Sequence, residues 1–192
     1  KRDDLRVFYM PQDAGDLLDF SLSPVELLSP SGKKEERSRS GILLGSMKFT
    51  ADEMNHPSAG LSGGQKAKLM FLMMAQSGAN VLLLDEPTNH LDMNSIAWLE
   101  TYLLNYPGAV LIVSHDRYFL NRVVTKVIEV EQGQLHTYMG NYSDFAVKKE
   151  QLREARLKEY LNQQREIKHQ EAVIEKLRSF NREKSIKRAE SR

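Results

Sequence analysis

The sequence of 192 residues can form one core domain with an appendage, or two small domains. It has the composition of a globular protein, 41% hydrophobic and 28% charged, with a formal net charge of +1. The absence of cysteine excludes disulfides and thiolate metal sites, and the five histidines show no i,i+4 pairing, so we expect no structural metal. No apolar run approaches the ~20 residues that span a bilayer, and the charged N-terminus is no signal peptide, so we expect a cytoplasmic protein.

Charge is unevenly distributed along the chain. Residues 146–192 hold 14 Lys and Arg against 8 Asp and Glu, whereas residues 1–145 hold 13 against 18. The body of the chain is therefore acidic and its tail is basic.

A strand is predicted at the start of the chain, followed by a long irregular region. The run "LRVFYM" at 5–10 reads as a strand that stops at Pro11. Residues 13–60 are poorly periodic. Within them, the Ser-, Gly- and Lys-rich residues 29–41 predict an exposed loop between short helices.

The middle of the chain predicts a βαβ unit preceded by a helix. A helix is expected from Gly64 to about Gln76, ending at Gly78. The continuous apolar run "VLLLDE" predicts a strand covered on both faces. The later run "AVLIVSHD" repeats the pattern of an apolar strand with a polar tip, and the amphipathic helix "MNSIAWLETYLL" lies between the two runs. Two such strands joined by a helix form a right-handed crossover in a parallel sheet.

The last third of the chain predicts a hairpin and then a long helix. Residues 127–140 alternate about Gly133, which is typical of a β-hairpin. From Asp144 to about Phe180 there is no Pro or Gly, and a narrow apolar seam recurs every seven residues, which suits a partner helix. We expect residues 180–192 to form a turn and the first residues of a returning helix.

Two sets of residues point to phosphate chemistry. Asp85 and Glu86 follow one predicted strand and His115 follows the next, and ligands of open parallel sheets bind at the carboxyl ends of the strands. There a carboxylate can hold Mg²⁺, a second can orient or deprotonate water, and a histidine can contact a terminal phosphate. At the mouth of the helix near Gly64, Ser62 and two glycines expose backbone N–H groups that suit an anion.

Four motifs resemble those of ATP-binding-cassette (ABC) ATPases in their order and spacing. They are "FYMPQD" with Gln12 at the Q-loop position, the signature motif "LSGGQ" at 61–65, Walker B with D-loop "VLLLDEPTNHLD" at 81–92, and the His switch "VSHD" at 113–116. The resemblance implies binding of ATP and Mg²⁺. It assigns roles to the matching residues: catalysis to Glu86 and His115, Mg²⁺ to Asp85 and Gln12, and contacts to ATP to Gln12, Leu61, Ser62, Gly63, Gly64, Gln65 and Asp92.

The resemblance also implies a partner. In this family two cassettes pack head to tail, and the signature helix of one caps the γ-phosphate of ATP held by the other. Ser62, Gly63 and Gly64 would then meet an anion bound in trans. Asp92 could equally be the N-cap of the following helix, and the two roles do not exclude each other.

The phosphate cradle of the family, GxxxxGK[S/T], has no match in residues 1–192. In the family this loop precedes the Q-loop. We therefore expect the chain to be a fragment of a cassette that, alone, binds ATP weakly or not at all and is inactive as an ATP hydrolase.

Three features resemble those of the ABC-F branch: "DEPTNHLD", "YMGNYSDFAVKKEQ" and the charged helix. Members of this branch join two cassettes through a helical linker and mostly act on the ribosome. The resemblance implies an α/β fold: a partial P-loop NTPase domain of ABC type with a helical subdomain at 1–142, followed by a long helical hairpin linker, of which 143–192 would be the first helix and tip. Tyr142 and Phe145 would pack the base of the linker.

Three functions remain open from the sequence. The first is an ABC-F ATPase that acts on the ribosome, in translation regulation or in protection from antibiotics. The second is the ATPase subunit of a membrane transporter, which the charged hairpin disfavours. The third is a non-enzymatic fragment that only folds and associates.

The basic tail predicts contact with ribosomal RNA. Residues 176–192 hold seven Lys and Arg against two Glu, and such a tip can exchange counterions for phosphate contacts. We expect Lys184, Lys187 and Arg188 to make them. A basic helix tip can equally be a solvated surface.

Overall fold

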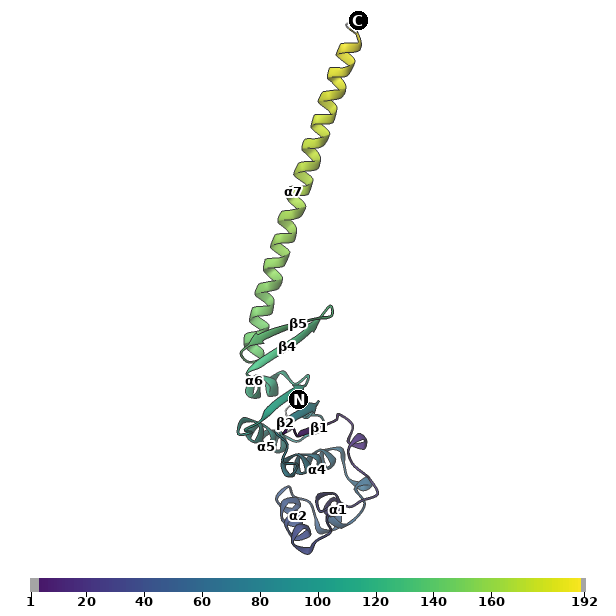
Figure 1. The fold of residues 1–192 in the computed structure, drawn as a ribbon, viewed down its shortest axis with the longest axis vertical. Helices are drawn as coiled ribbons and strands as arrows, with labels where there is room; N and C mark the ends of the chain where they lie inside the picture. The colour runs from purple at the N-terminus through teal and green to yellow at the C-terminus, as the bar shows by residue number, and fades with distance from the viewer. Residues whose placement is uncertain (1–3, 191–192) are drawn as a thin grey trace. The chain divides into compact units, whose positions relative to one another are not determined.

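The structure, a computed structural model, describes the backbone of residues 4–190 and the side chains of residues 4–179. The chain divides into two compact units, Lys1–Thr125 and Lys126–Arg192 (Figure 1). This division places the predicted hairpin with the long helix. The division reflects which residues contact one another within the chain. The boundary between cassette and linker after residue 142 therefore stays a prediction.

The first unit is built on a parallel sheet of three strands in the order β1-β2-β3. Their bounds are β1 (Val7–Met10), β2 (Val81–Asp85) and β3 (Ala109–Val113). In register, Tyr9 pairs with Leu83 and Leu83 with Leu111. The predicted strands and their parallel arrangement are confirmed.

Helices α4 (Gly63–Gln76) and α5 (Met93–Leu104) lie on one side of this sheet (Figure 1). The buried side chains of α4 include Leu69, Phe71 and Leu72, each at most 3% exposed, and burying one such side chain contributes about 1.5–3 kcal/mol. The predicted helix that ends near Gly78 is confirmed, since Gly78 has a φ of +61° immediately after the C-cap.

The opposite face of the sheet is exposed in the first unit. Tyr9 on β1 is 52% exposed, and Leu111 and Val113 on β3 are 52% and 59% exposed. On the other face Met10 of β1 is buried, and Val110 and Ile112 of β3 are half-buried against the core. The apolar runs of β1 and β3 are therefore covered on one face only, although parallel sheets are usually covered on both.

Further helices, most of them short, connect β1 to α4 and β3 to the second unit. Their bounds are η1 (Ala14–Asp16), α1 (Pro24–Leu28), α2 (Lys34–Ser46), α3 (Ala51–Asn55), η2 (Ser58–Gly60) and α6 (Arg117–Val123). The expectation of an exposed loop at 29–41 is wrong, because α2 begins at Lys34. The helix is held by tertiary contacts: Ser40 Oγ donates to the Leu28 carbonyl at 3.0 Å, and Leu44 is fully buried.

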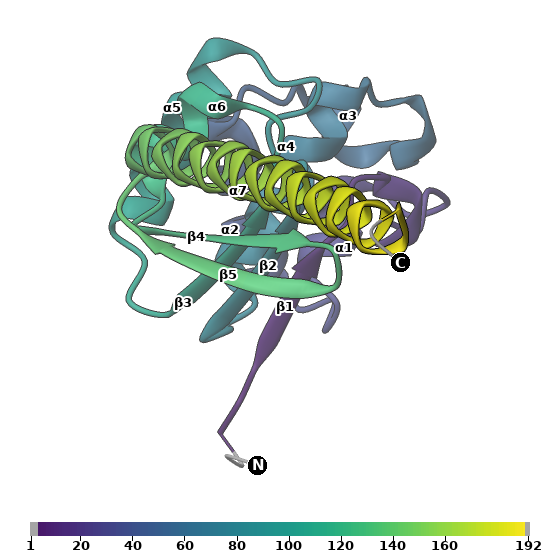
Figure 2. The same cartoon turned by 90° about the horizontal axis from the view of Figure 1, so that it is seen from above.

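In the second unit, strands β4 (Lys126–Glu131) and β5 (Gln134–Met139) form an antiparallel hairpin (Figure 2). The two turn residues, Gln132 and Gly133, have φ of +50° and +75°. Two positive φ angles are typical of a type I′ turn, whose twist matches that of the flanking strands. The predicted hairpin about Gly133 is confirmed.

Helix α7 (Tyr142–Glu190) follows the hairpin. The Asn141 N–H donates to the Asp144 carboxylate at 3.1 Å, and the Asp144 N–H donates to the Asn141 side-chain oxygen at 3.0 Å. These two hydrogen bonds cap the start of the helix. The centroid of the Phe145 ring lies 5.0 Å from that of Tyr138 on β5 and 5.7 Å from that of Tyr142. Aromatic packing thus holds the base of α7 against the hairpin.

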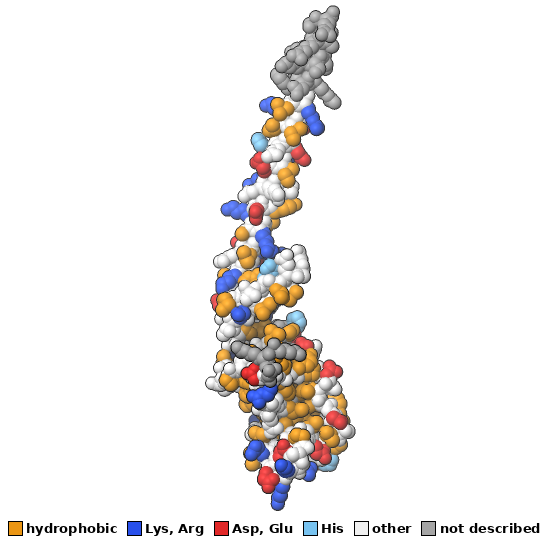
Figure 3. Space-filling model, in the orientation of Figure 1, with side chains coloured by type: hydrophobic (Ala, Val, Ile, Leu, Met, Phe, Trp, Pro, Cys, Tyr) orange, Lys and Arg blue, Asp and Glu red, His pale blue; other side chains and the backbone are white. Residues whose placement is uncertain are grey.

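The apolar seam of α7 is exposed, as Figure 3 shows along the described part of the helix. Tyr160, Ile167 and Ile174 are 56%, 45% and 48% exposed. The predicted turn after Phe180 is wrong, because α7 continues to Glu190. No Gly or Pro in residues 180–192 interrupts it.

Across the described residues, none of the helices combines the length and the apolar character that crossing a membrane requires.

Candidate functional site

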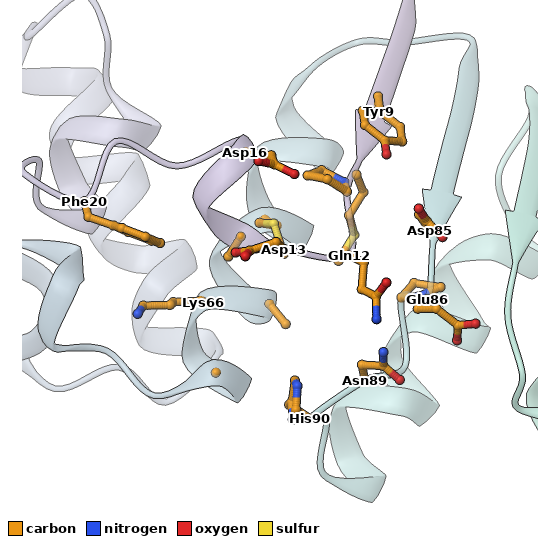
Figure 4. A pocket seen from close by; sticks show the side chains of 17 residues that line it. Tyr9, Gln12, Asp13, Asp16, Phe20, Lys66, Asp85, Glu86, Asn89 and His90 are labelled. Carbon is orange, nitrogen blue, oxygen red and sulfur yellow. The ribbon is translucent and has the colours of Figure 1, made fainter.

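Four of the predicted site residues, from three parts of the fold, line one open pocket of about 720 Å³ in the first unit. Gln12 follows β1, Asp85 is the last residue of β2, and Glu86 comes directly after it (Figure 4). Gly63 is the first residue of α4. They meet because the carboxyl ends of parallel strands lie at one edge of a sheet. The structure therefore brings together Gln12, both carboxylates and the start of the signature helix.

The Glu86 carboxylate is turned away from Gln12 (Figure 4) and is bound on the β3 side. Its Oε2 accepts hydrogen bonds from the His115 backbone N–H at 3.1 Å and from Ser114 Oγ at 3.3 Å. The Glu86 backbone N–H donates to the Val113 carbonyl at 2.8 Å, and Glu86 has a φ of +46°. The loop after β3 thus fixes one carboxylate oxygen.

The other oxygen, Glu86 Oε1, is buried and has no hydrogen-bond partner among the residues that the structure describes. His115 Nε2 approaches it to 3.5 Å, which is an ionic approach when the ring is protonated and not a hydrogen bond. A buried carboxylate oxygen without a donor is costly. It is therefore available to accept a hydrogen bond from a donor such as water.

His115 lies beside Glu86, but its side chain is 98% exposed. The neighbouring Asp116 caps α6, because its carboxylate accepts from the backbone N–H groups of Tyr118 and Phe119, both at 3.0 Å. The backbone of the loop is therefore held, while the imidazole itself is free to approach a ligand.

Gln12 and Asp85 supply an amide and a carboxylate to the pocket. Oxygen ligands of this kind suit Mg²⁺, which usually takes one or two carboxylates and completes its shell with water and phosphate oxygens. Among the described residues no group of three or more His, Asp or Glu is placed to hold a metal. The donor set fits an ion shared with phosphates rather than one caged by protein.

Ser62 is the N-cap of α4 and closes a capping box with Gln65. Ser62 Oγ accepts from the Gln65 N–H at 3.3 Å, and Gln65 Oε1 accepts from the Ser62 N–H at 2.9 Å. Gly63 and Gly64 are the first helical residues, whose N–H groups have no partner within the helix. With no acidic residue in this turn, the positive end of the helix is available to an anion. The Leu61 side chain is in the core.

The loop between β2 and α5 packs against this helix start. A Cβ on Gly64 would lie 2.9 Å from the carbonyl oxygen of His90, a residue with a φ of +63°. Asp92 accepts from the Ser95 N–H and hydroxyl at 2.8 and 2.7 Å, and from Lys68 Nζ on α4 at 3.0 Å. The part of the loop that precedes α5 therefore packs against the first turns of α4.

The hydrogen bond from the Ser95 hydroxyl, with those from the Ser95 backbone and Lys68, holds the pKa of Asp92 well below its usual range. Asp92 thus caps α5 as a carboxylate. The capping role is confirmed, and contact with a second cassette stays a prediction.

Sequence reasoning missed several residues of this region. Ser114 binds Glu86, and Lys68 binds Asp92. Lys68 could have been found from the sequence, because it lies one helical turn after Gly64 and therefore on the same face of the helix as the signature motif. The side chains of Lys184, Lys187 and Arg188 lie outside the described residues.

Two protein-family models, both described as ABC transporter, match the chain. One matches residues 4–89, and the other, an extension model, matches residues 128–192. The chain is 45% identical over 130 residues to the uncharacterized ABC transporter ATP-binding protein YfmR of Bacillus subtilis, covering 68% of this chain and 20% of YfmR. It is 39% identical over 157 residues to ABC transporter F family member 5 of Arabidopsis thaliana, covering 79% of this chain and 23% of that protein.

A solved structure shares the fold. The dimeric structure of the ATP-binding cassette MJ0796, in a post-hydrolysis state bound to ADP and Pi, matches with a TM-score of 0.57 at 19% identity, over 70% of this chain and 63% of that one. The chain spans about a fifth to a quarter of the length of the curated relatives named above.

Proposed function

Because the chain belongs to the ABC-F branch of the ATP-binding-cassette family, we propose that it forms part of an ATP hydrolase that acts on the ribosome in the cytoplasm. One observation carries the hydrolase assignment: Glu86, which lines the same pocket as Asp85, has a buried Oε1 that accepts no hydrogen bond from the described residues and lies 3.5 Å from His115 Nε2. A fixed carboxylate with one free oxygen suits a group that orients water and takes its proton.

Asp85 and Gln12 would hold Mg²⁺, which when bound would neutralise charge on the phosphates of ATP. Glu86 accepts the proton of the attacking water. The exposed ring of His115 approaches the terminal phosphate. Ser114 and the His115 backbone keep the carboxylate in place through Oε2, which leaves Oε1 for the water.

The start of α4 serves a second nucleotide. Ser62, Gly63 and Gly64 contact the γ-phosphate of ATP held by a second cassette, and Asp92 faces that cassette across the interface. The capping box supports this arrangement, because it uses the Ser62 oxygen as an acceptor and leaves its hydroxyl hydrogen to donate.

The relatives are several times longer than this chain, so we refer to the longer protein that would carry residues 1–192 as the full-length protein. In it, 1–142 form part of the first cassette and 143–192 begin the linker. Residues 1–192 contain no phosphate cradle. Turnover therefore needs a cradle from elsewhere, and the chain alone is not expected to hydrolyse ATP.

The ribosome assignment rests on the family and on the basic tail, and a salt series tests it. Replacing Lys184, Lys187 and Arg188 with Ala in the full-length protein removes three phosphate contacts. Ribosome binding should weaken, and the log-log slope of affinity against salt should become shallower by roughly two to three units, because fewer counterions are released. Co-sedimentation with ribosomes measures both quantities, and ATPase activity without ribosomes should stay nearly unchanged.

The matched control is the pair Lys33 and Lys34, exposed at the start of α2 in the first unit. Replacing both with Ala removes two positive charges, against three in the triple variant, and we expect no comparable change in slope. An unchanged slope in the triple variant would mean that the tail is a solvated helix surface.

A further inference from the structure

Two capping boxes lie close together at the start of α3 and of α4. In the first, the Thr50 hydroxyl accepts from the Glu53 N–H at 3.3 Å, and Glu53 Oε2 accepts from the Thr50 N–H at 2.8 Å. The second is the box of Ser62 and Gln65. Each box fixes the first turn of its own helix.

A side-chain hydrogen bond joins the two boxes. Gln65 Nε2 donates to Glu53 Oε1 at 2.5 Å, and both side chains are half-buried. Since Gln65 Oε1 accepts from the Ser62 N–H, the Gln65 amide uses both its oxygen and its nitrogen within the chain. The Glu53 carboxylate likewise uses both oxygens.

The bond has a charged acceptor. The hydrogen bond from the Thr50 backbone, followed by that from Gln65, lowers the pKa of Glu53, so the carboxylate is ionised at neutral pH. Hydrogen bonds to ionised groups are stronger than those between neutral groups. A continuous series of hydrogen bonds thus runs from the start of α3 to the start of α4, through Thr50, Glu53, Gln65 and Ser62.

We propose that Gln65 is a positioning residue, and not a ligand of the nucleotide: paired with Glu53, it fixes the start of α4 so that Ser62, Gly63 and Gly64 face the anion. The orientation of Ser62, Gly63 and Gly64 toward an anion rests on the function proposed above, whereas the pairing of Gln65 with Glu53 does not. This differs from the direct contact with ATP that the resemblance implies for Gln65.

A reciprocal exchange of the two side chains tests the pairing. Gln65→Glu alone sets two carboxylates against each other, and Glu53→Gln alone sets two amides together so that one bond is lost. In the double variant every bond is kept: the carboxylate introduced at position 65 accepts from the Ser62 N–H, and the amide introduced at position 53 accepts from Thr50 and donates to position 65. A capping box also works with Glu at its last position.

Hydrogen exchange of the 192-residue chain gives the first readout. Each single variant should speed exchange of the Ser62 and Gln65 amide protons by about tenfold, because the lost bond lets the helix start open locally. The double variant should return both rates to those of the unmodified chain. Unchanged exchange in both single variants would overturn the pairing.

The steady-state ATPase rate of the full-length protein gives the second readout. Both single variants should hydrolyse ATP more slowly, and the double variant should recover the unmodified rate. If the double variant stays as slow as Gln65→Glu although its exchange rates have returned to normal, the new carboxylate repels a phosphate and Gln65 is a ligand after all. An unmodified full-length protein without ATPase activity would refute the proposed function and leave the exchange result standing.

Discussion

Glu86→Gln in the full-length protein is expected to slow ATP hydrolysis by ~10²–10⁴-fold and to leave ATP binding intact. The amide keeps the shape of the side chain, and its oxygen can still accept from Ser114 and the His115 N–H. It cannot take a proton from water, which is the role proposed for Oε1. The protein should therefore accumulate with ATP bound and the cassettes closed, as single-turnover hydrolysis and nucleotide retention would measure.

The control for this variant is Glu35→Gln on the exposed first turn of α2, which makes the same chemical change away from the pocket. Its hydrolysis rate should match that of the unmodified protein. Turnover by Glu86→Gln at the unmodified rate would remove Glu86 from the role of base.

Gly64→Ala is expected to lower the ATPase rate of the full-length protein by about 10²-fold, the cost of displacing a reacting group by about 1 Å. The added Cβ would lie 2.9 Å from the His90 carbonyl oxygen, which is backbone and cannot rotate away. Either the loop before α5 or the start of α4 must move. Hydrogen exchange at both segments would show which one does.

Two neighbouring glycines serve as controls for Gly64. A Cβ on Gly60 meets no heavy atom within 4 Å, so Gly60→Ala should leave the rate nearly unchanged. A Cβ on Gly63 makes an ordinary contact of 3.5 Å with the His90 side chain. A loss of rate in Gly63→Ala with unchanged exchange would therefore report on the approach of the phosphate. A Gly64→Ala variant as active as Gly60→Ala would contradict the close packing of loop and helix.

The parts of the fold that were predictable from the sequence are those with local signals. The apolar runs of β2 and β3, the Gly78 stop of α4 and the turn at Gly133 are set by periodicity and by glycine conformation. Once the strands are parallel, Gln12, Asp85 and Glu86 must gather at one edge. The parallel topology alone therefore brings most of the predicted pocket residues together.

The parts that were missed depend on contacts between distant residues. Helix α2 reads as a loop because its first residues are polar, and the burial of Leu44 that holds it is invisible locally. Glu53 and Gln65 lie twelve positions apart on different helices, and the identity of neither residue predicts its contact with the other. The end of α7 was misplaced because no residue there stops a helix.

Above all, the start of α4 is expected to meet a nucleotide held by the other cassette. A photoreactive ATP analogue with its reactive group on the γ-phosphate can test this in the full-length Glu86→Gln protein, with labelled peptides identified by mass spectrometry. The peptide that contains Ser62, Gly63 and Gly64 should be labelled. Replacing the cradle lysine of the second cassette should abolish this label, and replacing that of the first should not. Label that survives loss of the second cradle would contradict the account.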